Sequence, residues 1–411
     1  METKNELLQG LFRKEFSKMV AVIGKYFSLQ HIEIAEDVVS ETFLQASETW
    51  GTKGIPENPA AWLYVVAKQK TLSHFRRNKI FTEKVLPKIK ESAVQNNNID
   101  LDFSNENIQD SQLQMLFAVC NPAIVSEAQI GLALRILCGF GIGEIAEAFL
   151  SNKETINKRL FRAKEKLRLE NIKLEMPPET EIGNRLDNVL HIIYLLFNEG
   201  YYSNTQNQVL CKDFCLEAMR LGILLTKNEK TNLPKTNALM AMMCFHTSRF
   251  NARQTSNNGI ILYDRQNEKL WDKELIAQGN VFLDKAVQGN EITSYHLEAG
   301  IAFWHCQKND TAEKWKNILH HYNLLLEINY SPSVALNRVY ALYKAKGREV
   351  ALPEAEKLQF TKSHFYFTLL GKLYKGVDNQ KAKQHYDKAL GMAKTQTDRQ
   401  TLKKKLENLK N

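Results

Sequence analysis

The sequence has no long apolar run, which argues against a protein embedded in a membrane. No stretch of about 18 apolar residues occurs, as a membrane-spanning helix would require. The opening stretch, METKNELLQGLFRKEF, carries charges throughout and has no apolar core of the kind found in a secretory signal. We therefore expect no membrane span and a cytoplasmic location.

Proline, glycine and cysteine are also scarce. Only 9 prolines and 19 glycines interrupt 411 residues, and apolar residues recur mostly at helical spacing, so the sequence predicts an all-α protein. The six cysteines are scattered, and the pair Cys211 and Cys215 has no second pair or histidine at metal-ligand spacing. We interpret them as core thiols in a reducing compartment and expect no metal site.

Motifs for catalysis are missing as well. The sequence has no glycine-rich loop that would cradle a phosphate, no serine-centred nucleophile elbow and no HExxH zinc motif. The ten histidines are dispersed. We therefore expect a protein that is not an enzyme and that needs no cofactor.

A basic stretch at residues 141–168 is the most informative part of the chain. It predicts two helices joined by a tight turn at residues 150–152, and Ser151 followed by Glu154 has the form of a capping box. The second helix carries an apolar stripe at helical spacing, formed by Ile156, Leu160, Ala163 and Leu167. Polar and basic residues fall on an arc away from that stripe: Thr155, Lys158, Arg159, Arg162 and Lys166.

This division of faces is typical of a DNA-binding helix-turn-helix. The buried face would hold the helix at its angle, and the free face could enter the major groove. The formal net charge of +9 favours a polyanionic partner. The alternative is a solvent-exposed helix whose cations merely face water.

The first unit, residues 5–79, predicts two further surfaces. In the helix from about Ile32 to Trp50, one face is apolar and the opposite face is acidic with a single leucine. The acidic face comprises Asp37, Glu41, Leu44 and Glu48. It could dock on a basic partner helix, or it could simply be solvated.

The next helix is predicted to begin at Asn58-Pro59, with Asn58 as its cap. Its first half is apolar nearly all round and its second half is basic. Along the helix, rings interleave with cations: Trp62, Tyr64, His74 and Phe75 with Lys68, Lys70, Arg76 and Arg77. Bases can stack on rings while cations meet phosphates, so this pattern suits unpaired nucleic acid. A core helix with an exposed charged end is the alternative, and both interpretations can hold together.

Residues 80–110 are rich in asparagine and aspartate and predict a flexible linker. A second small domain follows at residues 111–176. Residues 182–411 predict a long helical array, in which residues 365–393 approximate a tetratricopeptide helix pair. The pattern is carried by Phe367, Leu370, Gly371, Tyr374, Ala382, Tyr386 and Ala389. Such an array would be a scaffold that either binds a peptide or protein ligand or packs on itself.

Taken together, residues 8–79 and 110–170 resemble the extracytoplasmic-function class of bacterial RNA polymerase sigma factors. The resemblance rests on AEDVVSETFLQA (residues 35–46), NPAAWLYVVAKQKTLSHFRRN (58–78) and the basic helix-turn-helix, in this order and spacing. The remainder, with LHIIYLLFNEGYYS (190–203) and LFAVCNPAI (116–124), is similar to the subgroup with a C-terminal tetratricopeptide-like extension.

The resemblance implies two small helical sigma domains joined by the linker, followed by the extension. It implies core RNA polymerase and promoter DNA as partners, with chemistry left to the polymerase. Docking on the polymerase clamp is assigned to Asp37, Val38, Glu41, Leu44, Gln45 and Glu48. Contact with the minus-ten element is assigned to Asn58, Trp62, Lys70, His74, Arg76 and Arg77. Contact with the minus-thirty-five element is assigned to Lys153, Thr155, Asn157, Lys158, Arg159, Arg162 and Lys166.

Two departures from the family pattern stand out. Leu150 occupies a turn position where relatives often have glycine, and Asn121 stands where relatives often have histidine. The resemblance also implies regulation through the extension. A stand-alone helix-turn-helix regulator with a ligand-sensing helical domain is the alternative function, and a helical scaffold with an incidental basic helix is a third.

Overall fold

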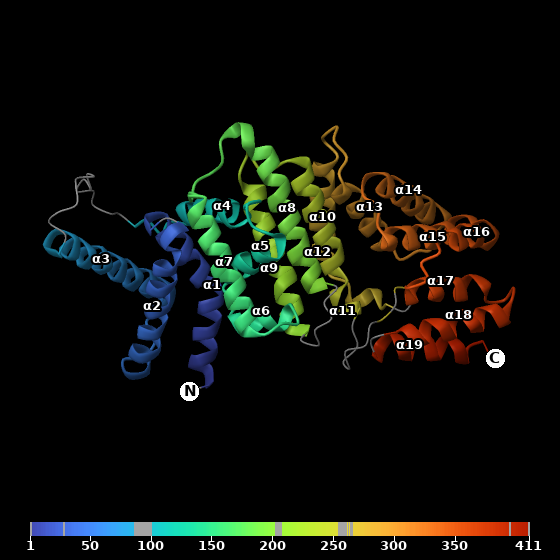
Figure 1. Ribbon diagram of the computed structural model, residues 1–411, viewed down its shortest axis with the longest axis horizontal. Helices are drawn as coiled ribbons and strands as arrows, with labels where there is room; N and C mark the ends of the chain where they lie inside the picture. Colours follow the sequence, from blue (N-terminus) through green and yellow to red (C-terminus); the bar gives the residue numbers. More distant parts are fainter. Residues whose placement is uncertain are drawn as a thin grey trace. The chain divides into compact units, whose positions relative to one another are not determined.

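The computed structural model describes residues 2–27, 29–85, 101–201, 208–253, 261, 263, 266–393 and 396–409. Across these ranges the regular secondary structure is helical and no strand occurs, so the all-α prediction is confirmed. The chain divides into two compact units, Met1–Thr231 and Asn232–Asn411. Figure 1 shows the first unit in blue to green and the second in yellow to red.

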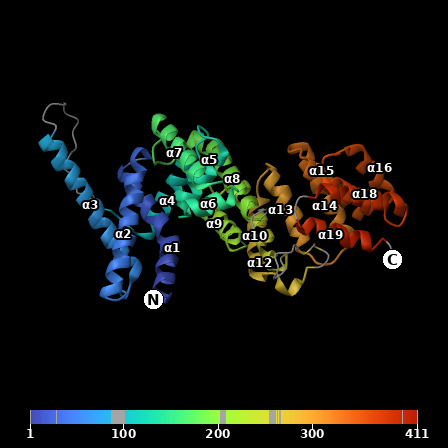
Figure 2. The same cartoon turned by 60° about the horizontal axis from the view of Figure 1, so that its bottom comes forward.

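Within its described residues, the first unit has nine α-helices, one short 3-10 helix (η1) and one short π-helix (η2). They are α1 (Glu2–Phe27), η1 (Leu29–His31), α2 (Ile32–Thr52), α3 (Pro59–Val85), α4 (Asn105–Val119), α5 (Ser126–Leu132), η2 (Ala133–Leu137), α6 (Ile142–Ala148), α7 (Lys153–Leu169), α8 (Glu179–Tyr201) and α9 (Gln208–Lys227). Helix α1 packs against α2 on one side and α4 on the other, as both views show (Figures 1 and 2).

The apolar stripes read from the sequence are the buried faces of these helices. In α2, Ala35, Val39, Phe43, Ala46 and Trp50 are buried, as their helical spacing predicts. The cap of α3 is also as expected, because the side chain of Asn58 accepts a hydrogen bond from the Ala61 amide at 3.1 Å.

The predicted linker at residues 80–110 is helical at both ends. Helix α3 extends to Val85, and α4 begins at Asn105, where Ser104 accepts the Asn107 amide at 3.3 Å. Leu101 is buried as well. Residues 86–100 lie outside the described residues. The polar composition that predicted a linker also suits the exposed ends of helices and their caps, which explains the difference.

The second unit continues with helices in consecutive packed pairs. They are α10 (Pro234–Ser248), α11 (Phe250–Arg253), η4 (Glu268–Leu270), α12 (Lys273–Ala286), α13 (Ser294–His305), α14 (Ala312–Ile328), α15 (Pro332–Lys346), α16 (Arg348–Leu358), α17 (His364–Tyr374), α18 (Asn379–Met392) and α19 (Gln396–Glu407). Most neighbours in sequence are neighbours in space, as in helical-repeat arrays.

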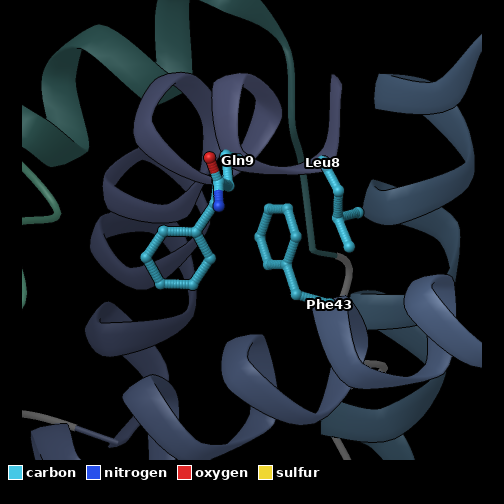
Figure 3. Close-up of a pocket in the computed structure, with 4 residues that line it drawn as sticks. Leu8, Gln9 and Phe43 are labelled. Atoms are coloured by element: carbon cyan, nitrogen blue, oxygen red, sulfur yellow. The ribbon is translucent and has the colours of Figure 1, made fainter. Parts of the chain in front are cut away.

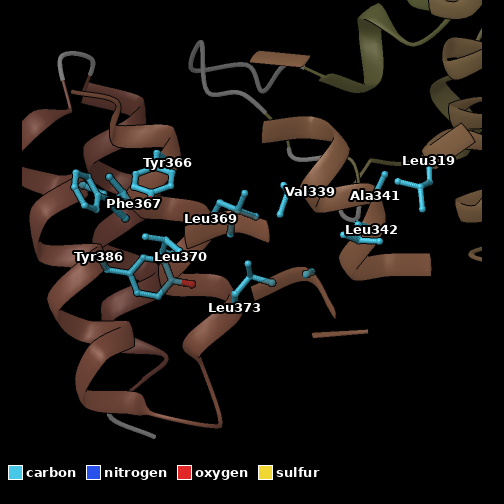
Figure 4. Packing of buried hydrophobic residues seen from close by; sticks show 14 of the residues in the cluster. Leu319, Val339, Ala341, Leu342, Tyr366, Phe367, Leu369, Leu370, Leu373 and Tyr386 are labelled. Atoms are coloured by element: carbon cyan, nitrogen blue, oxygen red, sulfur yellow. The ribbon is translucent and has the colours of Figure 1, made fainter. Parts of the chain in front are cut away.

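The core of α14–α19 is a continuous apolar cluster (Figure 4). Leu370, Leu373 and Tyr386 occupy its centre, between α17 and α18. Gly371 permits this close packing, because a Cβ atom there would lie 2.6 Å from the Tyr386 ring. All seven residues that carried the helix-pair pattern are buried.

Candidate polymerase and nucleic-acid interfaces

Helices α6 and α7 form the predicted helix-turn-helix. Leu150 in the turn adopts a left-handed backbone with φ +47°, and its amide donates to the Glu147 carbonyl at 3.1 Å. This is the conformation that glycine would adopt at no steric cost. The turn therefore has a backbone conformation that glycine would accept without strain.

The capping interaction of α7 differs from the prediction. Asn152, not Ser151, is the cap, and its side chain accepts the Thr155 amide at 2.8 Å. The reciprocal carboxylate contact occurs one helix earlier, where Glu144 accepts the Gly141 amide at 2.8 Å at the start of α6. Both Ser151 and Asn152 are good capping types, so the sequence alone could not select between them.

The basic face of α7 is open to solvent. The stripe Ile156, Leu160, Ala163 and Leu167 is buried, as predicted. Six of the seven residues assigned to the minus-thirty-five element are exposed: Lys153, Thr155, Asn157, Lys158, Arg162 and Lys166. Arg159 is half-buried, with its guanidinium 5.9 Å from the Phe149 ring centre.

A groove of about 440 Å³ runs beside this basic face. Its floor is apolar and comes partly from residues 123–125 and Ala128, and its rim is formed by Thr155, Lys158, Arg159, Arg162 and Lys166 of α7. The structure therefore brings together five of the seven residues assigned to this interface. Cations on a rim can meet phosphates while small apolar groups meet base edges.

The residues assigned to the minus-ten element are distributed along α3 and differ in exposure. Arg76 and Arg77 are exposed, and Asn58 caps the exposed start of the helix. Trp62 is half-buried against Trp50, with ring centroids 5.5 Å apart, and His74 meets the Phe27 ring edge-on at 5.3 Å. The two rings therefore contribute to packing within the unit as well as to its surface.

Lys70 reaches across to the acidic face, 3.3 Å from Glu41. Because Glu41 is 64% exposed, this ion pair is screened by water and contributes little stability. Either partner can exchange it for a charge on another molecule at small cost.

The acidic face of α2 is exposed as predicted, with one correction. Asp37, Glu41, Gln45 and Glu48 are exposed, and Leu44 leaves 61% of its surface open. Val38 is only 6% exposed and is part of the core, so it does not belong to a docking surface. The arc assigned to docking was too wide, because Val38 shares the inward side of α2 with Ala35 and Val39.

A shallow cavity of about 260 Å³ lies between α1 and the opposite, apolar face of α2 (Figure 3). It is lined by Leu8, Gln9, Phe12 and Phe43, and Figure 3 shows the Phe43 ring pointing toward Leu8. The cavity therefore belongs to the contact between α1 and α2, and exposed Leu44 alone gives the acidic face an apolar component.

The second unit contains a buried cationic cluster that sequence reasoning missed. Lys314 is fully buried and donates to the Tyr263 hydroxyl at 2.6 Å and to the Gln307 carbonyl at 2.5 Å. Lys308 and Arg249 also lie within 6.0 Å of the Tyr263 ring, at 5.6 and 5.8 Å. Burial lowers the pKa of Lys314 to about 8. No motif joins these residues: Arg249 follows α10, Lys308 lies between α13 and α14, and Lys314 lies in α14.

The remaining predictions concern membrane spans, metal sites and the cysteines. No helix among the described residues is long and apolar enough to cross a membrane. Within the same residues no group of three or more histidine, cysteine or acidic side chains could hold a metal ion. The five cysteines whose side chains are described are free and buried, and burial raises the pKa of Cys120, Cys138, Cys244 and Cys306. The side chain of Cys211 lies outside the described set.

Comparisons with known proteins identify a family for the region of α1 to α3. Residues 11–80, which span most of α1, all of α2 and most of α3, match the family model of sigma-70 region 2. This match supports a sigma factor. The chain is also 30% identical over 392 residues to an uncharacterized protein of Rhizobium meliloti (strain 1021), covering 94% of this chain and 92% of that protein. The two therefore share one family along nearly their whole length.

A second family model, a family of unknown function named DUF6596, matches residues 185–287 of the chain. No solved structure matches the chain. The acidic face of α2 and the basic end of α3 lie inside the region 2 match, whereas α6 and α7 lie outside both matches. Region 2 implies interaction with core RNA polymerase and promoter DNA, and sigma factors are not an enzyme family.

Proposed function

We propose that this sigma factor is of the extracytoplasmic-function class and directs core polymerase to a specific set of promoters. In this proposal the exposed residues of the α2 acidic face dock on a basic coiled coil of the polymerase clamp. Helix α3 opens the minus-ten element and holds its unpaired strand, and α7 reads the minus-thirty-five element in duplex DNA. The protein acts in the cytoplasm with the polymerase.

The observation that carries the proposal is the division of charge over one compact unit. An acidic face with an exposed leucine on α2 is accompanied by exposed cations on α3 and on α7. A stand-alone regulator would need the basic helix alone. The acidic face and the region 2 match therefore favour the sigma factor.

We further propose that the C-terminal helical extension regulates the sigma domains. The helix pairs of the second unit, with their apolar core and tightly packed Gly371, support a tetratricopeptide-like array. A peptide or protein ligand bound to such an array would supply the signal.

Reconstitution with core polymerase tests the proposal. We expect the chain to co-purify with core polymerase and to start transcripts at a defined promoter class, identified by sequencing those transcripts. Asp37→Arg should weaken core binding without a change in melting temperature, because Asp37 is exposed. Glu57→Arg, also exposed but outside the acidic face, is the matched control. A chain that binds promoter duplex tightly alone and never joins core polymerase would support the stand-alone regulator instead.

Arg162→Ala tests the role of α7. Loss of a base contact should weaken promoter use by about 1–3 kcal/mol on the cognate sequence and relax its specificity. Lys173→Ala, an exposed lysine beyond the end of α7, is the control. Equal losses on all promoter sequences would reassign Arg162 to the phosphate backbone.

A further inference from the structure

Two lysines of the second unit converge on one tyrosine. The ammonium groups of Lys308 and Lys314 lie 5.6 and 4.7 Å from the centre of the Tyr263 ring. The His305 ring meets the same tyrosine edge-on at 5.0 Å, and the Lys308 ammonium lies 5.8 Å from the ring centre of Trp271. We call these five residues the Tyr263 cluster.

The two lysines have neutral hydrogen-bond partners. Lys314 donates to the Tyr263 hydroxyl at 2.6 Å and to the Gln307 carbonyl at 2.5 Å, and Lys308 donates to the Gln266 carbonyl at 2.9 Å. Within the part of the chain that the structure describes, neither lysine forms a salt bridge. Buried charges in proteins are normally paired with an opposite charge, so completely buried Lys314 is an exception that requires a cause.

Asp310 is the described carboxylate that acts on Lys314, and it is already engaged by another cation. It pairs with Lys344, and 54% of its side-chain surface is exposed to water. Burial is the main cause of the lowered pKa of Lys314; Asp310 opposes this shift, while Arg249, Lys308 and Lys344 add to it. One exposed carboxylate therefore has to serve three lysines.

The backbone adds to the positive potential around Lys314. This lysine is the third residue of α14, directly after the cap Thr311. The N-terminal end of a helix carries a partial positive charge, which disfavours a cation and favours an anion in the first turn. A lysine buried at this point would be stabilised most effectively by an anion bound beside it.

Two ring nitrogens beside the lysines could also bind an anion. Nε1 of Trp271 and Nδ1 of His305 are buried, and neither has a hydrogen-bond partner within the described chain. Burial lowers the pKa of His305 well below its usual range, so its neutral ring carries one N–H that can donate. Buried polar groups normally have a partner, which can be an ion.

The cluster reaches the surface at the connection between α13 and α14. Gln307 is exposed and Lys308 is half-buried, whereas Lys314 and Trp271 are 0 and 6% exposed. A small ion can reach such a site beside Lys308. The surface of another protein could not contact Lys314 unless this part of the fold opened.

We propose that the Tyr263 cluster binds a small oxyanion, a phosphate or carboxylate group, at Lys308 and Lys314. Ammonium groups hold such oxygens through short charge-assisted hydrogen bonds, and Trp271 and His305 supply neutral donors. The inference goes beyond the proposed function. It concerns the second unit alone and holds whether or not the chain works with a polymerase.

Thermal unfolding of the full chain tests the site. Inorganic phosphate and acetate are titrated separately, each against sodium chloride at the same ionic strength. An anion that binds only the folded state stabilises it, so at about 100 times the dissociation constant we expect the melting temperature of the second unit to rise by roughly 5–10 °C. The larger of the two responses identifies phosphate or carboxylate as the preferred group, and no response to either anion would overturn the proposal.

Lys314→Met removes the buried ammonium and should abolish the response to both anions. Without added anion this variant should melt at or above the temperature of the native chain, because a buried charge without a counterion has been removed. Lys316→Met, at an exposed position on the same helix, is the control and should respond as the native chain does. Phosphate also stabilises proteins generally, by exclusion from their surface, so equal rises in the native chain and in Lys314→Met would refute the site.

Lys308→Met covers the case in which Lys314→Met does not fold. Lys308 is half-buried, so its loss should leave the fold intact and weaken anion binding by about 10- to 100-fold, as expected for one charged hydrogen bond. An unchanged affinity would contradict the proposal, which places both lysines on the anion. None of these measurements involves polymerase, so their failure would leave the proposed function untouched.

Discussion

Leu150 shows how one residue can carry strain in a functional turn. Its left-handed backbone costs a residue with a Cβ atom roughly 1–2 kcal/mol, and its side chain is 70% exposed, so little packing offsets the cost. We expect Leu150→Gly to raise the free energy of unfolding by about 1 kcal/mol, since strain relief outweighs the added freedom of the unfolded chain. Thermal and urea unfolding would measure it.

Leu150→Ala is the matched control, because it removes the exposed side chain and retains the Cβ atom. It should leave stability nearly unchanged. Equal gains in both variants would mean that the exposed leucine, rather than the backbone, is unfavourable.

The lowered pKa of Lys314 predicts that the free energy of unfolding depends on pH. Its folded pKa, lowered to about 8 by burial, lies below the ordinary lysine value of 10.5. Between these values the unfolded chain binds more protons, so the stability of the native state relative to a variant without the lysine should rise with pH. Below about pH 8 the full cost of the buried charge is present.

Lys314→Met should remove this dependence. We therefore expect the difference in stability, native chain minus Lys314→Met, to shift in favour of the native chain as pH rises from 8 to 10.5. Lys316→Met, an exposed position on the same helix, controls for helix packing. A difference that is flat over this window would contradict a depressed pKa for Lys314.

At the scale of elements, the pair α17 and α18 depends on one close contact. A methyl group at Gly371 would lie 2.6 Å from the Tyr386 ring, whereas one at Gly391 of α18 meets nothing within 4 Å. We expect Gly371→Ala to destabilise the second unit by about 1–3 kcal/mol through overpacking. Gly391→Ala should stabilise it by up to about 1 kcal/mol through helix propensity.

Melting of the two alanine variants checks this prediction. Changes of the same sign would mean that the helix pair is looser than the contact between Gly371 and Tyr386 indicates.

Much of each element could be predicted from the sequence, because helical periodicity directly encodes which face is buried. The stripe from Ile156 to Leu167 and the acidic face around Glu41 both followed from spacing alone. Val38 was assigned wrongly, since spacing does not give the exact width of a contact. The cap of α7 was missed by one residue, because Ser151 and Asn152 have nearly equal capping ability.

Contacts between elements could not be predicted in the same way. Glu36 and Lys164 are 128 residues apart and belong to no shared motif, so nothing in the sequence pairs them. The cluster around Lys314 could not be predicted either, because its residues share no motif. The exposed basic residues of α3 and α7 could be inferred separately, but not the ion pairs that join α2 to α7.

At the scale of the whole molecule, the unit boundary differs from the boundary suggested by the start of the extension at residue 182. Helices α8 and α9 complete the core of the first unit. Arg185 donates to the Phe117 carbonyl at 2.6 Å, Asn188 to the Cys120 carbonyl at 2.6 Å, and Arg220 to the Leu137 carbonyl at 2.5 Å. Without these donors, buried carbonyls would lose their partners at a cost of about 1–3 kcal/mol each.

We therefore expect a chain truncated after Thr231 to unfold cooperatively and a chain truncated after Glu181 to be several kcal/mol less stable. Calorimetry of the two truncated chains measures the difference. Transcription by the longer one then tests regulation by the second unit, free of any folding defect. Identical melting of both would show that α8 and α9 are dispensable to the first unit.

The path of the DUF6596 match across the unit boundary has an evolutionary consequence. The match covers residues 185–287, so it begins in α8 of one folded unit and ends beyond α12 of the next. A genetic exchange that replaced this segment as a whole would remove most of α8 and all of α9 from the core of the first unit. Viable hybrids between relatives should instead have their crossover at the short connection around residue 231, where the second unit could be exchanged without disturbing the core of the first.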